Sequence, residues 1–217
     1  MSLYERLVAE TETARNEFLA IPLLQRALHG DVTLEQYRAF LGQAYHHVRH
    51  TVPLLMGFGY HLPQRLQWLQ GAVIEYIEEE RGHEEWILDD IVACGGDAAK
   101  VSAAAPLPAT DTMVAYAHDV IRRRNPIGFF GMVFVLEGTS AQLATRAADI
   151  IGKTLQLPKS AFRYLTSHGS LDQDHVAFYR TLIDRLDAPE DQRALIQGAN
   201  AFYRLYGDIF RSLTPSH

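Results

Sequence analysis

The feature that most constrains the fold is a long segment with a strongly apolar run that contains a single acidic residue. Residues 126–152 include the run GFFGMVFVLEGTSAQLA, in which Glu137 is the one carboxylate. A helix of this composition is normally buried among other helices. A buried carboxylate without a partner costs several kcal/mol, so Glu137 must be neutral, paired with a cation or bound to a metal. An arginine partner inside the protein is the alternative to a metal.

The rest of the chain also has the pattern of helices. Glycine and proline separate long helical patterns, and no convincing strand alternation occurs. We expect Pro53 to kink one helix and Gly95-Gly96 to stop the next. Besides residues 126–152, we expect helices over residues 2–16, 21–28, 33–60, 63–94, 111–124, 158–186 and 189–213, with a loop over residues 100–109. The sequence therefore predicts an all-α bundle of about seven helices, forming one domain over residues 1–217.

Composition and charge exclude several classes of protein. The chain has 217 residues and a net charge of −6, whereas a nucleic-acid binder usually has a basic patch. Its first residues lack the apolar core of a secretory signal, and no apolar run approaches the ~20 residues that cross a bilayer. Cys94 is the only cysteine, so no disulfide can form within the chain. We expect a cytoplasmic protein that binds neither nucleic acid nor membrane.

The most specific chemical motif is H-x3-D-x2-H, formed by His168, Asp172 and His175. With His168 at 0° on a helix, Asp172 lies near about +40° and His175 near about −20°. All three side chains therefore project from one stripe. Two imidazoles and one carboxylate are the ligand set that non-haem iron favours. The alternative is a polar helix face that carries two histidines by chance.

A second group of candidate ligands lies in the segment IEEERGHEEWILDD. Glu80 and His83 are three residues apart and share a face if the helix continues through them. Glu79 lies four residues before His83 and is a rival to Glu80. An acidic, solvent-facing helix surface explains most of the other carboxylates here.

Together these residues make three carboxylates and three imidazoles on three predicted helices. Helical bundles build di-iron sites from inward side chains of this kind on facing helices. Two metal ions would share them, with one carboxylate bridging, and the thiolate set typical of structural zinc is absent. The candidate ligands are Glu80, His83, Glu137, His168, Asp172 and His175.

A further cluster on the helix predicted over residues 33–60 contains Tyr45, His46, His47 and His50. His46 and His50 share a face, and His47 points elsewhere. These groups either bind a substrate or the ligand carboxylates by hydrogen bonds, or are histidines with structural partners in the bundle.

Two resemblances add to this interpretation. The segment IPLLQRALHGDVTLEQYRAFLGQAYHHV resembles the early helices of the TenA thiaminase and pyrroloquinoline-quinone synthase branches of the haem-oxygenase-like fold. The order of E-x2-H, a lone glutamate in VLEGTS and H-x3-D-x2-H is similar to the haem-oxygenase-like diiron oxidase family. The resemblance implies a haem-oxygenase-like bundle and the same six residues as iron ligands. Some members carry the acid seven residues before the histidine, and Tyr76 occupies that position here.

The resemblance also implies a function. A diiron oxidase or oxygenase uses two Fe(II) ions to activate O2 and oxidise a small substrate, such as an amino acid, a fatty acid or an aromatic acid. O2 and that small molecule would be its partners, and we expect a homodimer.

Four alternatives remain at this stage. A cofactorless oxidase of the quinone-synthase kind and a TenA-like hydrolase use the same fold. A mono-iron enzyme would use only His168, Asp172 and His175, and the last alternative is a non-catalytic binding protein. Against a TenA-like enzyme, whose cysteine nucleophile lies in a late helix, Cys94 lies near the middle of the chain.

Overall fold

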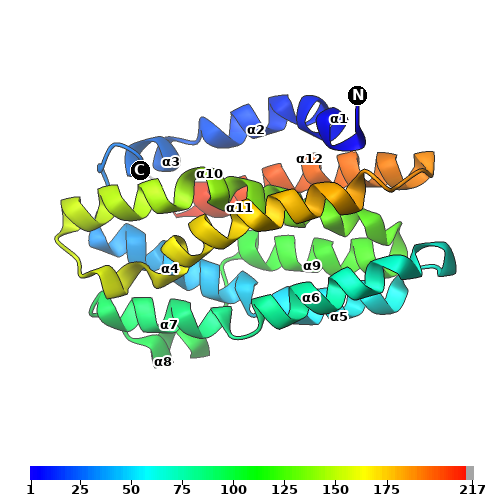
Figure 1. Ribbon diagram of the computed structural model, residues 1–217. Helices are drawn as coiled ribbons and strands as arrows, with labels where there is room; N and C mark the ends of the chain where they lie inside the picture. Colours follow the sequence, from blue (N-terminus) through cyan, green and yellow to red (C-terminus); the bar gives the residue numbers. More distant parts are fainter. Residues whose placement is uncertain (214–217) are drawn as a thin grey trace.

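The computed structural model is a bundle built from helices, as the sequence predicts (Figure 1). It describes residues 1–213, apart from the side chains of residues 169–174. Within that part, the chain divides into more helical segments than the sequence suggested, because several long predicted helices are interrupted. In order they are α1 (Leu3–Glu10), α2 (Glu12–Leu19), α3 (Pro22–Ala27), α4 (Leu34–Val48), α5 (Thr51–His61), η1 (Gln64–Leu69), α6 (Gln70–Glu80), α7 (His83–Ala93), α8 (Ala98–Ala103), α9 (Pro108–Arg123), η2 (Pro126–Phe129), α10 (Phe130–Leu155), η3 (Lys159–Phe162), α11 (Arg163–Ile183) and α12 (Pro189–Ser212).

The predicted kink at Pro53 is wrong in position. The chain breaks earlier, at Arg49 and His50, between α4 and α5. Pro53 lies in the first turn of α5, where the missing N–H has no helical partner to lose. At the other end of α4, Thr33 and Gln36 form a capping box that starts the helix.

The single helix predicted over residues 63–94 is also wrong. It consists of η1, α6 and α7, and α6 ends at Glu80. Arg81 is extended, and Gly82 has φ +89°, a left-handed conformation that glycine adopts without strain. The new helix α7 then begins at His83. The predicted stop at Gly95-Gly96 is confirmed, whereas part of the predicted loop over residues 100–109 belongs to α8.

Of the three longest helices, α10 packs against both α11 and α12. In Figure 1, α10 and α11 run side by side. A Cβ on Gly131 would lie 2.2 Å from the backbone nitrogen of Ala199, so this glycine permits the close approach of α12 to α10. Gly138 has no such role, because a Cβ there would meet nothing within 4 Å.

Two apolar clusters make up the core; each includes part of α10 and part of α11, while α6 contributes to one cluster and α7 to the other. On α10, Val135 belongs to one cluster and Ala144 to the other. On α11, Tyr179 and Leu165 are divided likewise, and so are Tyr76 of α6 and Ile87 of α7. The stretches between these residues carry Glu137, His168, His175, Glu80 and His83. The candidate ligands therefore lie at the seam between two apolar cores.

The expectation that no apolar run approaches the length that crosses a bilayer is wrong: the stretch Pro126–Leu155 is long and apolar enough, judged by length and composition alone. More than half of its most apolar window is buried inside the protein. Packing against α11 and α12 accounts for that apolar character.

Candidate metal centre

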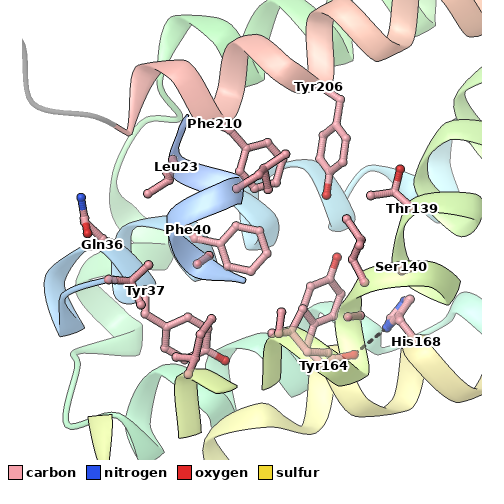
Figure 2. Close-up of a pocket in the computed structure, with 18 residues that line it drawn as sticks. Leu23, Gln36, Tyr37, Phe40, Thr139, Ser140, Tyr164, His168, Tyr206 and Phe210 are labelled. Atoms are coloured by element: carbon pink, nitrogen blue, oxygen red, sulfur yellow. Dashed lines mark hydrogen bonds between the residues drawn. The ribbon is translucent and has the colours of Figure 1, made fainter. Parts of the chain in front are cut away.

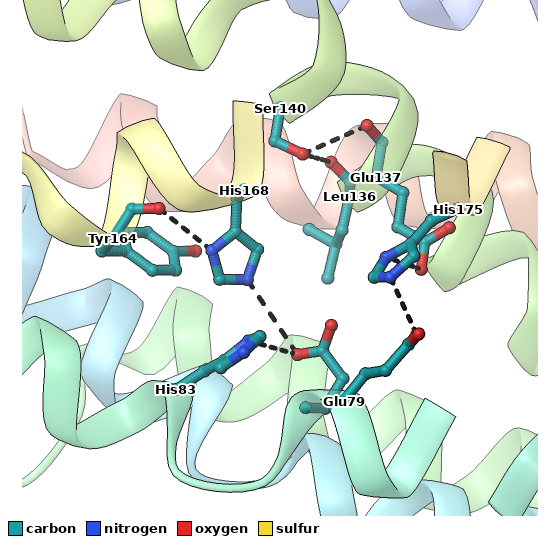
Figure 3. Close-up of polar contacts among 9 residues, drawn as sticks. Glu79, His83, Leu136, Glu137, Ser140, Tyr164, His168 and His175 are labelled. Carbon is teal, nitrogen blue, oxygen red and sulfur yellow. Dashed lines mark hydrogen bonds and ion pairs between the residues drawn. The ribbon is translucent and has the colours of Figure 1, made fainter. Parts of the chain in front are cut away.

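The seam between the two cores gathers the predicted ligands from opposite sides. His168 and His175 come from α11 and Glu137 comes from α10, while Glu79 and His83 approach from the facing α6 and α7 (Figure 3). Two groups of three side chains each have ligand atoms within 4.8 Å of one another, and each could hold a metal ion.

The first group consists of Glu80, His83 and His168. The Nδ1 of His83 lies 3.2 Å from Oε2 of Glu80, and the Nε2 of His168 lies 4.0 Å from the same oxygen. The Nδ1–H of His168 donates to the carbonyl oxygen of Tyr164 at 3.0 Å. That bond fixes the ring and leaves Nε2, on the side of Glu80, as the nitrogen that can bind a metal.

The second group consists of Glu80, Glu137 and His175. The Nδ1 of His175 lies 3.6 Å from Oε1 of Glu137. All three residues are at least nine-tenths buried. Glu80 belongs to both groups, which is the geometry expected of a carboxylate that bridges two ions.

The structure separates the alternatives for several of these residues. Glu80 rather than Glu79 belongs to the two groups; Glu79 is half exposed and contacts Nε2 of His175 at 2.8 Å from the solvent side. For Glu137, the ion pair seen is with His175 and not with the arginine considered above. Asp172, the sixth predicted ligand, lies among residues 169–174, outside the described side chains.

The break between α6 and α7 helps to bring Glu80 and His83 together. On a continuous helix they would share a face, but here the turn at Gly82 sets the first residue of α7 against the last residue of α6. The two side chains still meet, and both are buried. The sequence analysis therefore expected Glu80 and His83 to lie together correctly, but for the wrong reason, since they do not share one continuous helix.

The electrostatics of the group centre on Glu80. Burial alone would raise its pKa, but the neighbouring imidazoles of His168 and His83 outweigh burial and lower the pKa to about 2. Glu80 is therefore a carboxylate at neutral pH, the form that binds a metal.

A second carboxylate fixes the start of the helix that carries two of the ligands. Asp90 of α7 is fully buried and accepts hydrogen bonds at 2.9 Å from the backbone N–H groups of Arg163 and Tyr164. Burial raises the pKa of Asp90 to about 6, against the opposite effect of these bonds. The contact ties α11 to α7 one turn before His168, which fixes the depth at which that imidazole lies.

An apolar pocket of about 110 Å³ reaches the first group from one side (Figure 2). Side chains of α3, α4, α10, α11 and α12 line it, including Phe40, Leu143, Ala147 and Phe210. Among the described residues that line it, none carries a carboxylate, an ammonium or a guanidinium group. His168 lies at its wall together with Ser140, Tyr164 and Tyr206.

A second cavity, the inner cavity, has a volume of about 80 Å³ and lies against both metal-binding groups. Its wall includes Glu80, Glu137 and His168, together with His47 and Tyr76. It shares Ser140, Tyr164, His168 and Tyr206 with the apolar pocket, so the two spaces adjoin beside His168. Sequence reasoning did not find either space; the small residues of α10 that line the pocket were the available signal.

The cluster of histidines on α4 divides in a way that the sequence did not resolve. His47 lines the inner cavity and its ring contacts Tyr206 edge-on, with ring centroids 5.9 Å apart. His46 is buried against Tyr45, and His50 contacts His118. Of the three histidines, His47, which was expected to point away from the other two, is therefore the one that lies beside the candidate metal centre.

In the described part of the chain, the protein is a helical bundle with a cluster of carboxylates and histidines between its two apolar cores. The model of a family described as iron-containing redox enzymes matches residues 38–207, and this chain belongs to that family. The family resemblance expected from the sequence is thereby confirmed. Among curated proteins, none matches the sequence.

Solved structures show the same fold. A domain of unknown function with a heme oxygenase-like fold from Shewanella denitrificans has a TM-score of 0.86 at 23% identity, covering 97% of this chain and 91% of that one. A TenA homolog from Pseudomonas syringae has a TM-score of 0.80 at 11% identity, over 97% and 92% of the two chains. Heme oxygenase-1 from Synechocystis, in complex with heme, has a TM-score of 0.78 at 14% identity, over 98% and 92%. At these identities the likeness concerns the fold alone.

The donor set itself fits iron. Each group combines carboxylate oxygen with imidazole nitrogen, the ligand types that non-haem iron favours, and the ligand atoms of each group lie close enough to surround one ion. His168 also has the backbone hydrogen bond that metal-binding histidines typically make through their other nitrogen.

Proposed function

We propose that this protein holds two iron ions in the seam and uses O2 to oxidise a small organic substrate bound in the apolar pocket. The observation that carries the proposal is the position of Glu80 in two adjacent groups of ligands. A single metal site needs only one such group. A carboxylate common to both supports a pair of ions with one bridging ligand.

The residues of the chain have distinct tasks in this proposal. Glu80 would be shared by the two ions, His83 and His168 would hold one of them, and Glu137 and His175 would hold the other, with Asp172 as the predicted further ligand. Iron, when bound, supplies the electrons that reduce O2 to an oxidant. The carbonyl of Tyr164 holds His168 in the tautomer that presents Nε2. Burial of the cluster keeps water away from the reacting groups.

The lining of the apolar pocket favours a substrate with a largely apolar body. A zwitterionic amino acid placed there would lose hydration at both charges without a charged partner among the described lining residues. An aliphatic or aromatic acid avoids this cost if its carboxylate is at the metal end, near His168, and its apolar part extends along Leu143 and Phe40.

A TenA-like hydrolase is less well supported because the chain's one cysteine is poorly placed for it. Cys94 is buried in an apolar cluster, and burial, followed by the charge of Asp90, raises the pKa of its thiol to about 11. The residue lines neither the apolar pocket nor the inner cavity. A thiol in this environment is not a ready nucleophile.

The test is the iron content of protein reconstituted with Fe(II) without oxygen, followed by measurement of O2 consumption. We expect two ions per chain, and almost none in Glu80→Ala, since each group then keeps only two of its three ligands. Glu78→Ala is the matched control; this exposed carboxylate, two residues before Glu80, belongs to neither group, so the variant should keep both ions. Full activity in the presence of a chelator would instead identify a cofactorless enzyme and refute the proposal.

A further inference from the structure

Two buried polar groups in the inner cavity take no part in holding the proposed metal ions. Tyr76 is 2% exposed and His47 is 3% exposed, and both line the cavity next to Glu80 and Glu137. Neither Oη of Tyr76 nor Nδ1 of His47 has a hydrogen-bond partner in the part of the protein that the structure describes. Buried polar atoms of this kind are rare, and they commonly mark a place where a ligand or ordered solvent binds.

The surroundings of these groups are otherwise well packed, so loose packing does not explain them. The ring of Tyr76 contacts the ring of His175 edge-on, with centroids 5.9 Å apart, and the ring of Phe178 at 5.8 Å. The ring of His47 packs against Tyr206. Both rings are therefore held in place while one polar atom of each is left for a partner that is not part of the fold.

The two groups also have the right chemistry for a small ligand that accepts hydrogen bonds. The hydroxyl of Tyr76 is an O–H group that can donate a hydrogen bond. Burial lowers the pKa of His47 to about 3, with His168 adding to the effect, so the ring is neutral. A neutral imidazole can present an N–H at Nδ1 while its other nitrogen accepts.

We infer that His47 and Tyr76 bind, by hydrogen bonds, the small anionic or oxygen-containing ligand that the metal centre takes into the inner cavity. The inference rests on the proposed function, since it assigns these residues to a ligand of the proposed iron pair. It divides the site in two: the apolar pocket takes the body of the substrate, and the inner cavity takes the small ligand. The spaces adjoin at Ser140, Tyr164, His168 and Tyr206, beside which the two reactants would meet.

The test uses azide as a small anionic probe of the iron-loaded, oxidised protein, with its dissociation constant measured by optical titration. We expect Tyr76→Phe, which removes only the hydroxyl, to weaken azide binding by roughly tenfold or more, the usual effect of losing one hydrogen bond to a charged group. Its control is Tyr60→Phe, which removes an exposed hydroxyl and should change nothing.

His47 is tested with a pair of substitutions. His47→Leu should weaken azide binding by a similar factor, whereas His47→Asn, whose amide nitrogen lies near the position of Nδ1, should restore most of the affinity. His46→Leu is the control; that neighbouring histidine is equally buried but does not line the inner cavity. Restoration by asparagine would separate a hydrogen-bonding role from a packing role.

Iron content measured on the same samples makes each outcome decisive. Normal iron with weakened azide binding supports the inference. Normal iron with unchanged azide affinity in both Tyr76→Phe and His47→Leu overturns it and leaves the proposed function standing. Loss of iron in Tyr76→Phe would overturn it in favour of a role in holding the metal. If the unaltered protein takes up no iron, the proposed function fails, and this inference fails with it.

Discussion

Substitution of Gly131 by alanine tests how tightly α10 is set against α12. The added Cβ would lie 2.2 Å from the nitrogen of Ala199 and 2.6 Å from the carbonyl carbon of Gly198, where non-bonded carbon contacts normally begin near 3.5 Å. Both obstacles are helix backbone and cannot rotate aside, so the two helices must separate by about 1 Å. Overpacking of this kind costs about 3 kcal/mol, and alanine's helix propensity returns about 1 kcal/mol. The net loss of about 2 kcal/mol should lower the Tm by roughly 4–8 °C for a chain of this size.

Gly138 provides the matched control on the same helix, seven residues further on. A Cβ there meets nothing within 4 Å, so Gly138→Ala should gain about 0.5–1 kcal/mol from helix propensity and raise the Tm by roughly 1–4 °C. Thermal unfolding of both metal-free variants, followed by circular dichroism, measures the difference. A Gly131→Ala protein as stable as the unaltered one would refute the close packing of α10 on α12.

Three further predictions concern the metal centre and the apolar pocket. His175→Ala should abolish iron-dependent O2 consumption while the circular dichroism spectrum stays helical, and Glu137→Gln should weaken iron binding tenfold or more; normal turnover in the first or unchanged iron affinity in the second would remove that residue from the proposed site. Ala147→Trp should fill the apolar pocket and weaken binding of the neutral fluorescent probe 1-aminoanthracene by about tenfold, at unchanged iron content, because it removes the space that an apolar ligand occupies. Thr145→Trp is its control on an exposed position of the same helix, and equal effects of the two tryptophans would argue against the pocket as the binding place.

The positions of the helix ends show where sequence reasoning lacked information. Pro53 was expected to kink a helix, yet it lies in the first turn of α5, a place where proline costs nothing. Gly82 gave no clear signal, since an isolated glycine is tolerated inside many helices. Its left-handed conformation is selected because the chain must pass from α6 to α7 while Glu80 and His83 stay buried and in contact. The conformation of Gly82 therefore depends on what α6 and α7 pack against, which the local sequence does not show.

The sequence by itself determined the helical class and most of the candidate ligands of the metal centre. Periodicity and spacing are local properties, so the stripe of His168 and His175 and the lone acid Glu137 could be recognised without coordinates. Tertiary structure alone decided that Glu80 is shared by two groups, that Glu79 is not, and that His47 and Tyr76 face the inner cavity. These relations join residues of α4, α6, α10 and α11, and distances between helices follow from how side chains fill the space between them, which no local pattern records.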